Sequence, residues 1–206
     1  MTFTMRHYAV LASLAQAPRS GYDIAHWFAY VTKHFCAFGH SSVYPALADL
    51  ERQGLVMYTE VPSEQGPIRK VYQLTQAGQD ALLDWVDEPA GDAEVRDEQL
   101  LKALCYGFLS PERAIALLRI ARARHVERAR AYEELVRVAE ADMESEDPHT
   151  AAAALGRRLT CRRGVGSQEG YIAWCDEAIS SIEAFAARAG RAHATGRGSR
   201  AHGAGA

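Results

Sequence analysis

The sequence lacks the features that define several large classes of protein. Among its 206 residues, no apolar run approaches the roughly 18 to 20 residues that a membrane-spanning helix needs. The N-terminus has no basic segment followed by an apolar stretch and a cleavage site. The cysteines are few and far apart, at Cys36, Cys105, Cys161 and Cys175, and they form no C-x-x-C pair. We therefore expect a cytoplasmic protein whose thiols are reduced.

Motifs of the common enzyme classes are absent as well. The chain contains no G-x-S-x-G, no phosphate-binding P-loop and no H-E-x-x-H. His34, Cys36 and His40 are suitable metal ligands by type, but they straddle an expected helix end and no fourth ligand follows at a typical spacing. We expect no catalytic residue, no cofactor and no metal site.

The positive charge that marks many nucleic-acid-binding proteins is also missing. The net charge is −3, and residues 1–88 alone carry six Lys or Arg against nine Asp or Glu. The arginines between residues 119 and 130 are interleaved with glutamates, which is typical of a solvated helix face. Any contact with DNA must therefore depend on a few local groups.

Helical periodicity dominates the first fifty residues. One helix is expected over residues 4–17, and a second begins near Ser20 and fades out between residues 36 and 39. A third begins at Ser41 or Ser42, which we expect to cap it, and ends at Gly54. Its buried stripe is Val43, Leu47 and Leu50, and Pro45 belongs in its first turn.

The period then changes to two. Residues 55–60 and 71–74 alternate around a turn rich in Pro and Gly, which predicts a two-stranded hairpin. Thr75 caps a fourth helix that ends before Pro89. Three helices followed by a hairpin indicate a winged helix-turn-helix domain, so the predicted fold class is mainly α with a small β wing.

The rest of the chain is predicted to be helical. Helices are expected from about residue 93 to Phe108, from Pro111 to about Met143, and over a last segment whose coiled-coil seam needs a partner. We assign that seam to a dimer interface made of Ile172, Cys175, Ile179 and Ile182. The predicted organisation is a DNA-binding domain at 1–88, a helical dimerisation and effector-sensing domain at 93–187, and a disordered tail at 188–206.

Two neighbouring elements carry groups suited to a DNA backbone. The third helix begins with hydroxyls beside free backbone N–H groups, at Ser41, Ser42 and Tyr44, and such an end binds phosphates. The tip of the hairpin combines a rigid turn with the adjacent cations Arg69 and Lys70, which suits a minor groove or its phosphates.

Four segments resemble the PadR family of repressors in order and spacing. They are Gly21 to Ile24, Ser42 to Leu47, Leu50 to Val56 and Arg69 to Gly78. The resemblance implies a homodimer that binds a palindromic operator and is released by a small, often aromatic, effector. The DNA-contacting residues that it implies, together with those above, are Tyr22, His40, Ser41, Ser42, Tyr44, Gly66, Arg69 and Lys70.

The effector site and the class of partner stay open at this point. Aromatic residues that could line a space between the two domains are Trp85, Tyr106, Tyr132, Tyr171 and Trp174, although aromatics at helical spacing more often form plain core. A winged helix can also bind proteins instead of DNA, and Cys36 could serve a metal- or redox-sensing regulator. No membrane partner is expected.

Overall fold

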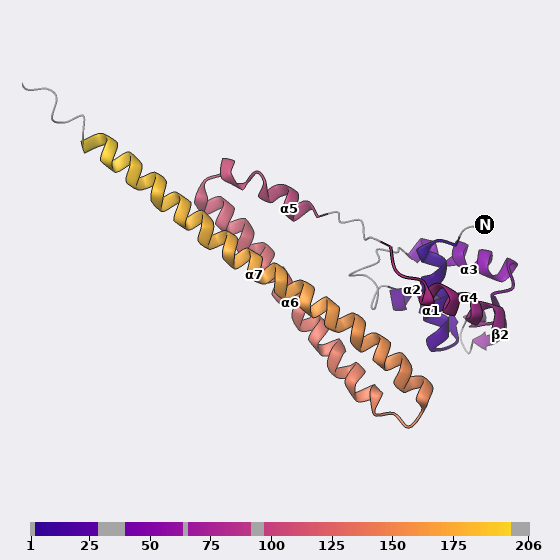
Figure 1. Ribbon diagram of the computed structural model, residues 1–206. Helices are drawn as coiled ribbons and strands as arrows, with labels where there is room; N and C mark the ends of the chain where they lie inside the picture. Colours follow the sequence, from indigo (N-terminus) through magenta and orange to yellow (C-terminus); the bar gives the residue numbers. More distant parts are fainter. Residues whose placement is uncertain (1–2, 29–39, 64–65, 92–96, 199–206) are drawn as a thin grey trace, which may run out of the picture. The chain divides into compact units, whose positions relative to one another are not determined.

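The structure, a computed structural model, describes residues 3–28, 40–63, 66–91 and 97–198 (Figure 1). It divides the chain into two units, Met1–Ala93 and Glu94–Ala206, next to the predicted boundary between residues 88 and 93. Within the described ranges, every helix is too short or too polar to span a bilayer. Each unit is described by itself below.

The N-terminal unit encloses one hydrophobic core. Its helices are α1 (Met5–Gln16), α2 (Gly21–Trp27), α3 (Val43–Arg52), which follows the 3-10 turn η2 (His40–Ser42), and α4 (Gln76–Asp87). Leu11, Ile24, Phe28, Leu47 and Leu50 are among its fully buried side chains. The predicted extension of the second helix to residues 36–39 lies outside the described residues.

A three-stranded antiparallel sheet completes this unit. Its strands are β1 (Arg19–Ser20), β2 (Val56–Ser63) and β3 (Gly66–Leu74), in the spatial order β1-β3-β2. The predicted fold class, mainly α with a small β wing, is confirmed. The sequence predicted β2 and β3 but missed β1, because a strand of two residues is too short to show alternation.

The end of α3 fixes how the hairpin leaves the helix. Gly54 has a φ of 71°, and the N–H of Leu55 donates to the Leu50 carbonyl (3.0 Å), which together form a Schellman motif. A non-glycine residue rarely adopts this φ, so Gly54 is required by the backbone itself. Thr75 caps α4 as predicted, since its hydroxyl oxygen accepts from the Gly78 N–H (3.1 Å).

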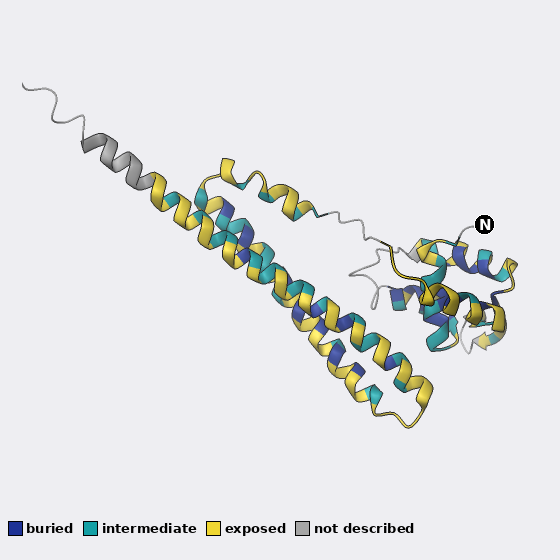
Figure 2. Ribbon diagram, in the orientation of Figure 1, coloured by how far each residue is buried: buried dark blue, intermediate teal, exposed yellow. Residues whose placement is uncertain are grey.

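The C-terminal unit is a long helical hairpin preceded by short helices. Its elements are α5 (Glu98–Ala103), the 3-10 turn η3 (Tyr106–Phe108), α6 (Pro111–Met143) and α7 (Pro148–Gly198). The predicted cap at Ser110 is confirmed, because its hydroxyl accepts from the Arg113 N–H (3.3 Å). The buried residues of α6 and α7 lie on the sides of the two helices that face each other (Figure 2).

Two predictions for this unit differ from the structure. The helix expected up to Phe108 is instead α5 followed by η3, and the last helix continues to Gly198 instead of ending at 187. The segment from 188 has no apolar period, but Ala and Arg are strong helix formers. Adding residues to an existing helix avoids the cost of nucleation, so absence of a core does not prevent extension.

Candidate functional site

Helix α3 buries one face and leaves a mostly apolar face open. Val43, Ala46, Leu47 and Leu50 pack into the core of the N-terminal unit. On the other side, Tyr44 is 58% exposed and its neighbours along this face, Ser41, Pro45 and Ala48, are exposed as well. The exposed face is narrow and carries no cation in its first turns, so hydroxyls and small apolar groups are what it can offer.

The predicted serine cap of α3 is wrong in its mechanism. Ser42 occupies the N-cap position, but its side chain makes no capping hydrogen bond to the helix backbone. The reason is its backbone: Ser42 ends η2 in the right-handed helical region, whereas a capping side chain needs an extended N-cap residue. Pro45 does lie in the first turn, as predicted.

Helix α2 begins beside this face with a capping box. The Asp23 N–H donates to Ser20 Oγ (3.2 Å), while the Ser20 N–H and hydroxyl both donate to the Asp23 carboxylate (3.1 and 2.7 Å). The side-chain hydrogen bond from Ser20 is the main reason that the pKa of Asp23 lies below its ordinary value. The box fixes the first turn of α2, which presents Tyr22 to solvent with 67% of its surface exposed.

The two cations of the hairpin lie on opposite faces of β3. Successive residues of a strand point to opposite sides, and the contacts agree: Lys70 Nζ lies 3.7 Å from the centre of the Tyr58 ring, whereas Arg69 is near enough to Asp23 to help lower the pKa of that carboxyl. A hydrogen bond to Tyr58 raises the pKa of Lys70. The hairpin therefore offers positive charge on both sides instead of one adjacent pair.

Asp49, an acid on α3, is held by neighbouring side chains. Asp49 Oδ1 accepts from Arg52 (2.9 Å), and His7 Nε2 of α1 lies 3.5 Å from the other carboxylate oxygen. The contact with Arg52 is the main cause of the lowered pKa of Asp49, and His7 adds to it. These contacts offset part of the negative charge that the sequence placed in this domain.

The predicted DNA-contacting residues thus fall into two groups within one unit. Tyr22, Ser41, Ser42 and Tyr44 belong to the starts of α2 and α3, while Gly66, Arg69 and Lys70 belong to β3, where Gly66 pairs with Ser63. His40 begins η2, and its side chain lies outside the described part. Sequence reasoning assigned no contact to Gly21, which begins the first PadR-like segment, or to Tyr58. In the structure these residues lie against Tyr44 and Lys70 respectively.

The aromatic residues predicted for the effector site have different surroundings, each within its own unit. Trp85 stacks on Tyr8 in the N-terminal unit (4.4 Å between ring centres), Tyr132 is buried between α6 and α7, and Tyr106 follows α5. Tyr171 and Trp174 alone form a pair, with edge-to-face rings 6.4 Å apart on α7. Tyr132 is therefore core, as aromatic residues at helical spacing often are.

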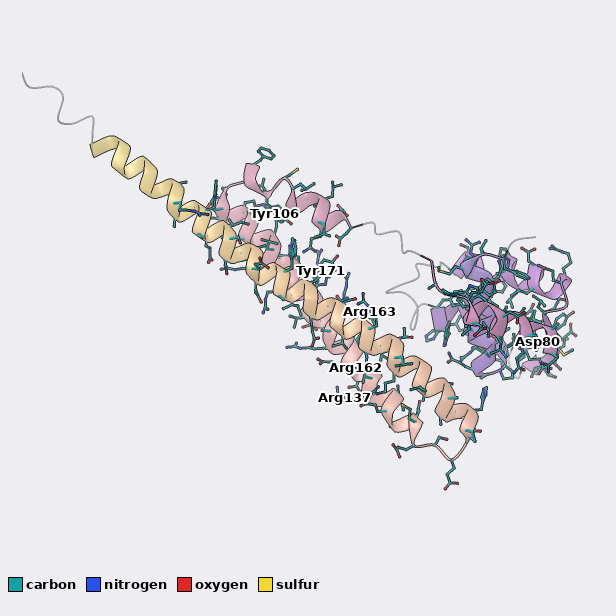
Figure 3. The ribbon with its side chains drawn as sticks, in the orientation of Figure 1. Asp80, Tyr106, Arg137, Arg162, Arg163 and Tyr171 are labelled. Carbon is teal, nitrogen blue, oxygen red and sulfur yellow. The ribbon has the colours of Figure 1, made fainter. Side chains whose placement is uncertain are left out.

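A shallow groove runs along α7 beside that pair. It has a volume of about 360 Å³, and Figure 3 shows Arg163 and Tyr171 on the same helix. Tyr171 also stacks face to face on the buried His125 (4.5 Å), whose Nδ1 lies 2.8 Å from Gln168 Oε1. The groove combines aromatic rings with a guanidinium, and its lining residues are Arg163, Gly166, Ser167, Gly170, Tyr171 and Trp174.

One residue of the predicted dimer seam, Cys175, is buried within its own chain. Cys175 is fully buried in a single chain, where the Gln99 side chain of α5 donates to its sulfur (3.6 Å). Burial raises the pKa of this thiol. Ile172, Ile179 and Ile182 are half-buried. Cys175 was predicted to face a second chain, but the hairpin is antiparallel and α5 and α6 already supply its neighbours.

The chain belongs to the PadR-like family of transcriptional regulators. Residues 10–84 match the family described as "Transcriptional regulator PadR-like family", and residues 95–183 match the family described as "Virulence activator alpha C-term". The two matches together account for most of both units. The class of this protein is therefore a regulator of transcription and not an enzyme.

The alignments with relatives of assigned role cover almost the whole length of those relatives. The negative transcriptional regulator PadR of Bacillus subtilis is 28% identical over 182 residues, which are 85% of this chain and 96% of that protein. The structure of B. subtilis PadR with operator DNA has a TM-score of 0.74 at 25% identity, covering 85% and 98% of the two chains. The structure of the virulence activator AphA of Vibrio cholerae has a TM-score of 0.63 at 28% identity. The match covers 87% of this chain and 99% of that chain.

Small-molecule binding is recorded for one of these relatives. The structure of B. subtilis PadR in complex with p-coumaric acid has a TM-score of 0.68 at 25% identity, and it covers 85% of this chain and 97% of that one.

Proposed function

We propose that this protein is a cytoplasmic repressor that binds operator DNA as a homodimer. The observation that carries the proposal is the surface formed by Tyr22, Tyr44 and Ser41 in the same small unit as the Arg69 and Lys70 hairpin. Its B. subtilis relative was crystallised with operator DNA. A helix of this exposure and length fits the major groove, and a hairpin with cations on both faces can reach phosphates on both strands.

The charges predict an unusual balance of binding energy. Arg69 and Lys70 are the two cations assigned to DNA in each chain, so a dimer neutralises four phosphates with them. Because each neutralised phosphate contributes about 0.9 to the slope of log affinity against log salt, the expected magnitude is roughly 4. Hydroxyls and backbone N–H groups, which release no counterions, supply the remaining contacts.

The primary test is binding to the DNA upstream of the protein's own gene. Footprinting should reveal a palindrome whose half-sites lie one or two helical turns apart. The double variant Arg69→Ala with Lys70→Ala should lose at least about tenfold in affinity and most of the salt dependence. Arg130→Ala is the matched control, because Arg130 is an exposed arginine of α6 that pairs with Glu127 (2.9 Å).

Two outcomes would overturn the proposal. If the purified protein protects no DNA but captures a protein partner equally well with and without the two cations, it is a protein-interaction module. If operator binding raises transcription of a reporter instead of lowering it, the protein is an activator, which is what the name of the V. cholerae relative describes.

The dimer is assigned to the C-terminal unit. Short helices there expose large apolar side chains to solvent: Leu104 is 78% exposed, Phe108 is 90% exposed, and Phe185 of α7 is exposed too. Leu101 and Leu104 also line an apolar groove of about 390 Å³. The lining of this groove is mainly apolar, and large exposed apolar patches indicate an interface.

Analytical ultracentrifugation tests this assignment. Leu104→Ser with Phe108→Ser should shift the protein from dimer to monomer without lowering the melting temperature of the hairpin, since neither side chain is buried in one chain. Leu83→Ser, at an exposed leucine of α4, is the control. A double variant that stays fully dimeric would contradict the assignment.

The effector is assigned to the chemistry of small aromatic acids. Tyr171 and Trp174 provide ring surfaces and Arg163 provides a cation for a carboxylate, all within the α7 groove. The B. subtilis relative binds p-coumaric acid. An acid that prefers a conformation with different spacing of the two DNA-binding units would shift the population away from the operator-bound form.

Titration with p-coumaric acid tests both the α7 groove as the effector site and small aromatic acids as the class of effector. Binding should quench the fluorescence of Trp174 and weaken operator affinity, and Arg163→Ala should weaken both effects by about tenfold or more. Arg162→Ala is the control, because Arg162 is the adjacent exposed arginine and lines a different groove. If no aromatic acid changes the operator affinity, the effector assignment is wrong and the protein is a repressor without this effector.

A further inference from the structure

We propose that Gly21 is a positioning residue for DNA binding, because it leaves room for the ring of Tyr44 and so fixes where the Tyr44 hydroxyl meets a phosphate. The proposal rests on the DNA-binding function above. Gly21 is the first residue of α2, and Tyr44 lies in the first turn of α3. A Cβ at Gly21 would lie 2.7 Å from Tyr44 Cε1 and 3.3 Å from its Cδ1 and Cζ.

The backbone at Gly21 does not require glycine. Among the described residues, Gly54 is the glycine whose φ is positive, so Gly21 has a φ that any residue can adopt. Glycine is less favourable than alanine inside a helix, and the first turn shares part of that cost. What distinguishes this position is space, since real Cβ atoms essentially never approach another atom to 2.7 Å.

The contact orients a side chain that is otherwise free to move. Tyr44 is 58% exposed, so the core does not fix its ring, yet one edge of the ring lies against the buried Gly21. The carbon that bears the hydroxyl, Cζ, is one of the three atoms nearest to the Cβ position of Gly21. The phenol is therefore held at the start of α2, next to the exposed Tyr22, before any DNA arrives.

Preorganisation of this kind increases affinity without adding a contact. An immobilised side chain does not lose its rotamer freedom on binding, so this entropy cost is avoided. A hydroxyl that donates to a phosphate contributes a charge-assisted hydrogen bond as well. Both gains depend on the ring lying over Gly21.

The substitution Gly21→Ala separates this role from a role in folding. The three atoms nearest to its added methyl group belong to the ring of an exposed side chain, so Tyr44 can rotate away while the core stays intact. We expect operator affinity to fall about tenfold and the melting temperature to stay within a few degrees of the parent. Tyr44→Phe, which keeps the ring and removes the hydroxyl, should lose a similar factor.

A double-variant cycle makes the test specific. If Gly21 acts through Tyr44, Gly21→Ala should have no further effect on affinity in a Tyr44→Ala background. The salt slope should stay unchanged in all of these variants, because a neutral hydroxyl releases no counterion, whereas Lys70→Ala should reduce its magnitude by about 2 per dimer. Gly91→Ala, which adds a methyl group in open space, is the control.

The outcomes distinguish this proposal from the function on which it rests. If the parent protein binds its operator and Gly21→Ala binds equally well, or if Gly21→Ala still costs tenfold in the Tyr44→Ala background, the positioning role is overturned and DNA binding stands. Operator binding by Tyr44→Phe at parental affinity overturns it too. If the parent protein binds no DNA, the proposed function itself fails.

Discussion

The two units of this chain bury their apolar residues in different ways. In the N-terminal unit, residues from four helices and the sheet converge on one core that includes large side chains such as Phe28 and Leu11. In the C-terminal unit, α6 and α7 bury a single line of residues between two helices, and many members of that line are alanines. The first unit forms a closed core, and the second a seam with both outer sides exposed.

This difference suits the N-terminal unit to hold side chains rigidly and the C-terminal unit to bind a second chain. A closed core fixes the angle between α2, α3 and the hairpin, so groups such as Tyr44 can be placed to within fractions of an ångström. The C-terminal unit also leaves apolar groups such as Phe108 of η3 in solvent, and a second copy can cover them. Glycines that permit close approach occur in both units, so they offer a direct comparison.

The largest effect is expected at Gly78 in the N-terminal unit. A Cβ there would lie 2.0 Å from the Leu55 carbonyl oxygen, which is backbone and cannot move aside. Gly78→Ala should lower the free energy of unfolding of this unit by about 3 kcal/mol, as strong overpacking does. Urea titration followed by circular dichroism would measure the loss.

Gly156→Ala is the control for that substitution. Gly156 is also helical but has open space around its Cβ position, so alanine there should leave stability equal or slightly higher. A Gly78→Ala variant as stable as the parent would show that α4 can shift away from Leu55 and that the core is less rigid than the comparison states.

An intermediate effect is expected at Gly164 in the C-terminal unit. A Cβ there would lie 2.5 Å from the ring of Tyr132, a buried side chain with little room to turn. Gly164→Ala should lower the free energy of unfolding of the hairpin by about 1 to 2 kcal/mol, because two helices can separate slightly where a closed core cannot. Thermal melting would detect it.

Gly170→Ala provides the reference on the same helix, since its Cβ position is open. Destabilisation by Gly164→Ala that equals or exceeds that of Gly78→Ala would show that the α6/α7 seam is as rigid as the closed core of the N-terminal unit.

The smallest effect concerns pH and the start of α2. Hydrogen bonds from Ser20 lower the pKa of Asp23 from its ordinary value of 3.8, so their contribution is present above that value and is lost as the pH falls through the folded-state pKa. Asp23→Asn should lower the free energy of unfolding by about 1 kcal/mol at pH 7, the usual size of a cap. The difference from the parent should shrink as the pH falls below 3.8.

Asp84→Asn, at an exposed aspartate of α4, is the matched variant and should change the free energy of unfolding less at pH 7. A difference between Asp23→Asn and the parent that grows on acidification would contradict the assigned hydrogen bonds.

Local signals in the sequence predicted much of the N-terminal unit. The stripe of Val43, Leu47 and Leu50, the stop at Gly54 and the cap at Thr75 each depend on residues a few positions apart, so their physics is visible in the sequence. Strand β1 was missed because its identity comes only from pairing with Val71 and Tyr72, about fifty residues later. The extension of α7 was missed because composition was taken to favour disorder.

The site residues divide in the same way. Tyr22, Tyr44, Arg69 and Lys70 could be predicted because hydroxyls and cations near a predicted helix start and turn indicate phosphate contacts. Strand alternation alone predicts that Arg69 and Lys70 point to opposite faces of β3. It does not predict that Asp23 and Tyr58 are their respective neighbours. No sequence signal separated the aromatic core residue Tyr132 from the groove residue Tyr171.

The sequence by itself therefore determined which segments are helices and strands, where most of them stop, and which family the chain belongs to, because capping, periodicity and turn chemistry are short-range. Only the tertiary structure decided that Gly21 lies under Tyr44, that Cys175 is covered by its own chain, and that Tyr132 is buried whereas Tyr171 lines a groove. Those facts depend on packing between elements that are distant in sequence. The whole core determines how closely such elements approach, so residues a few positions apart do not predict it.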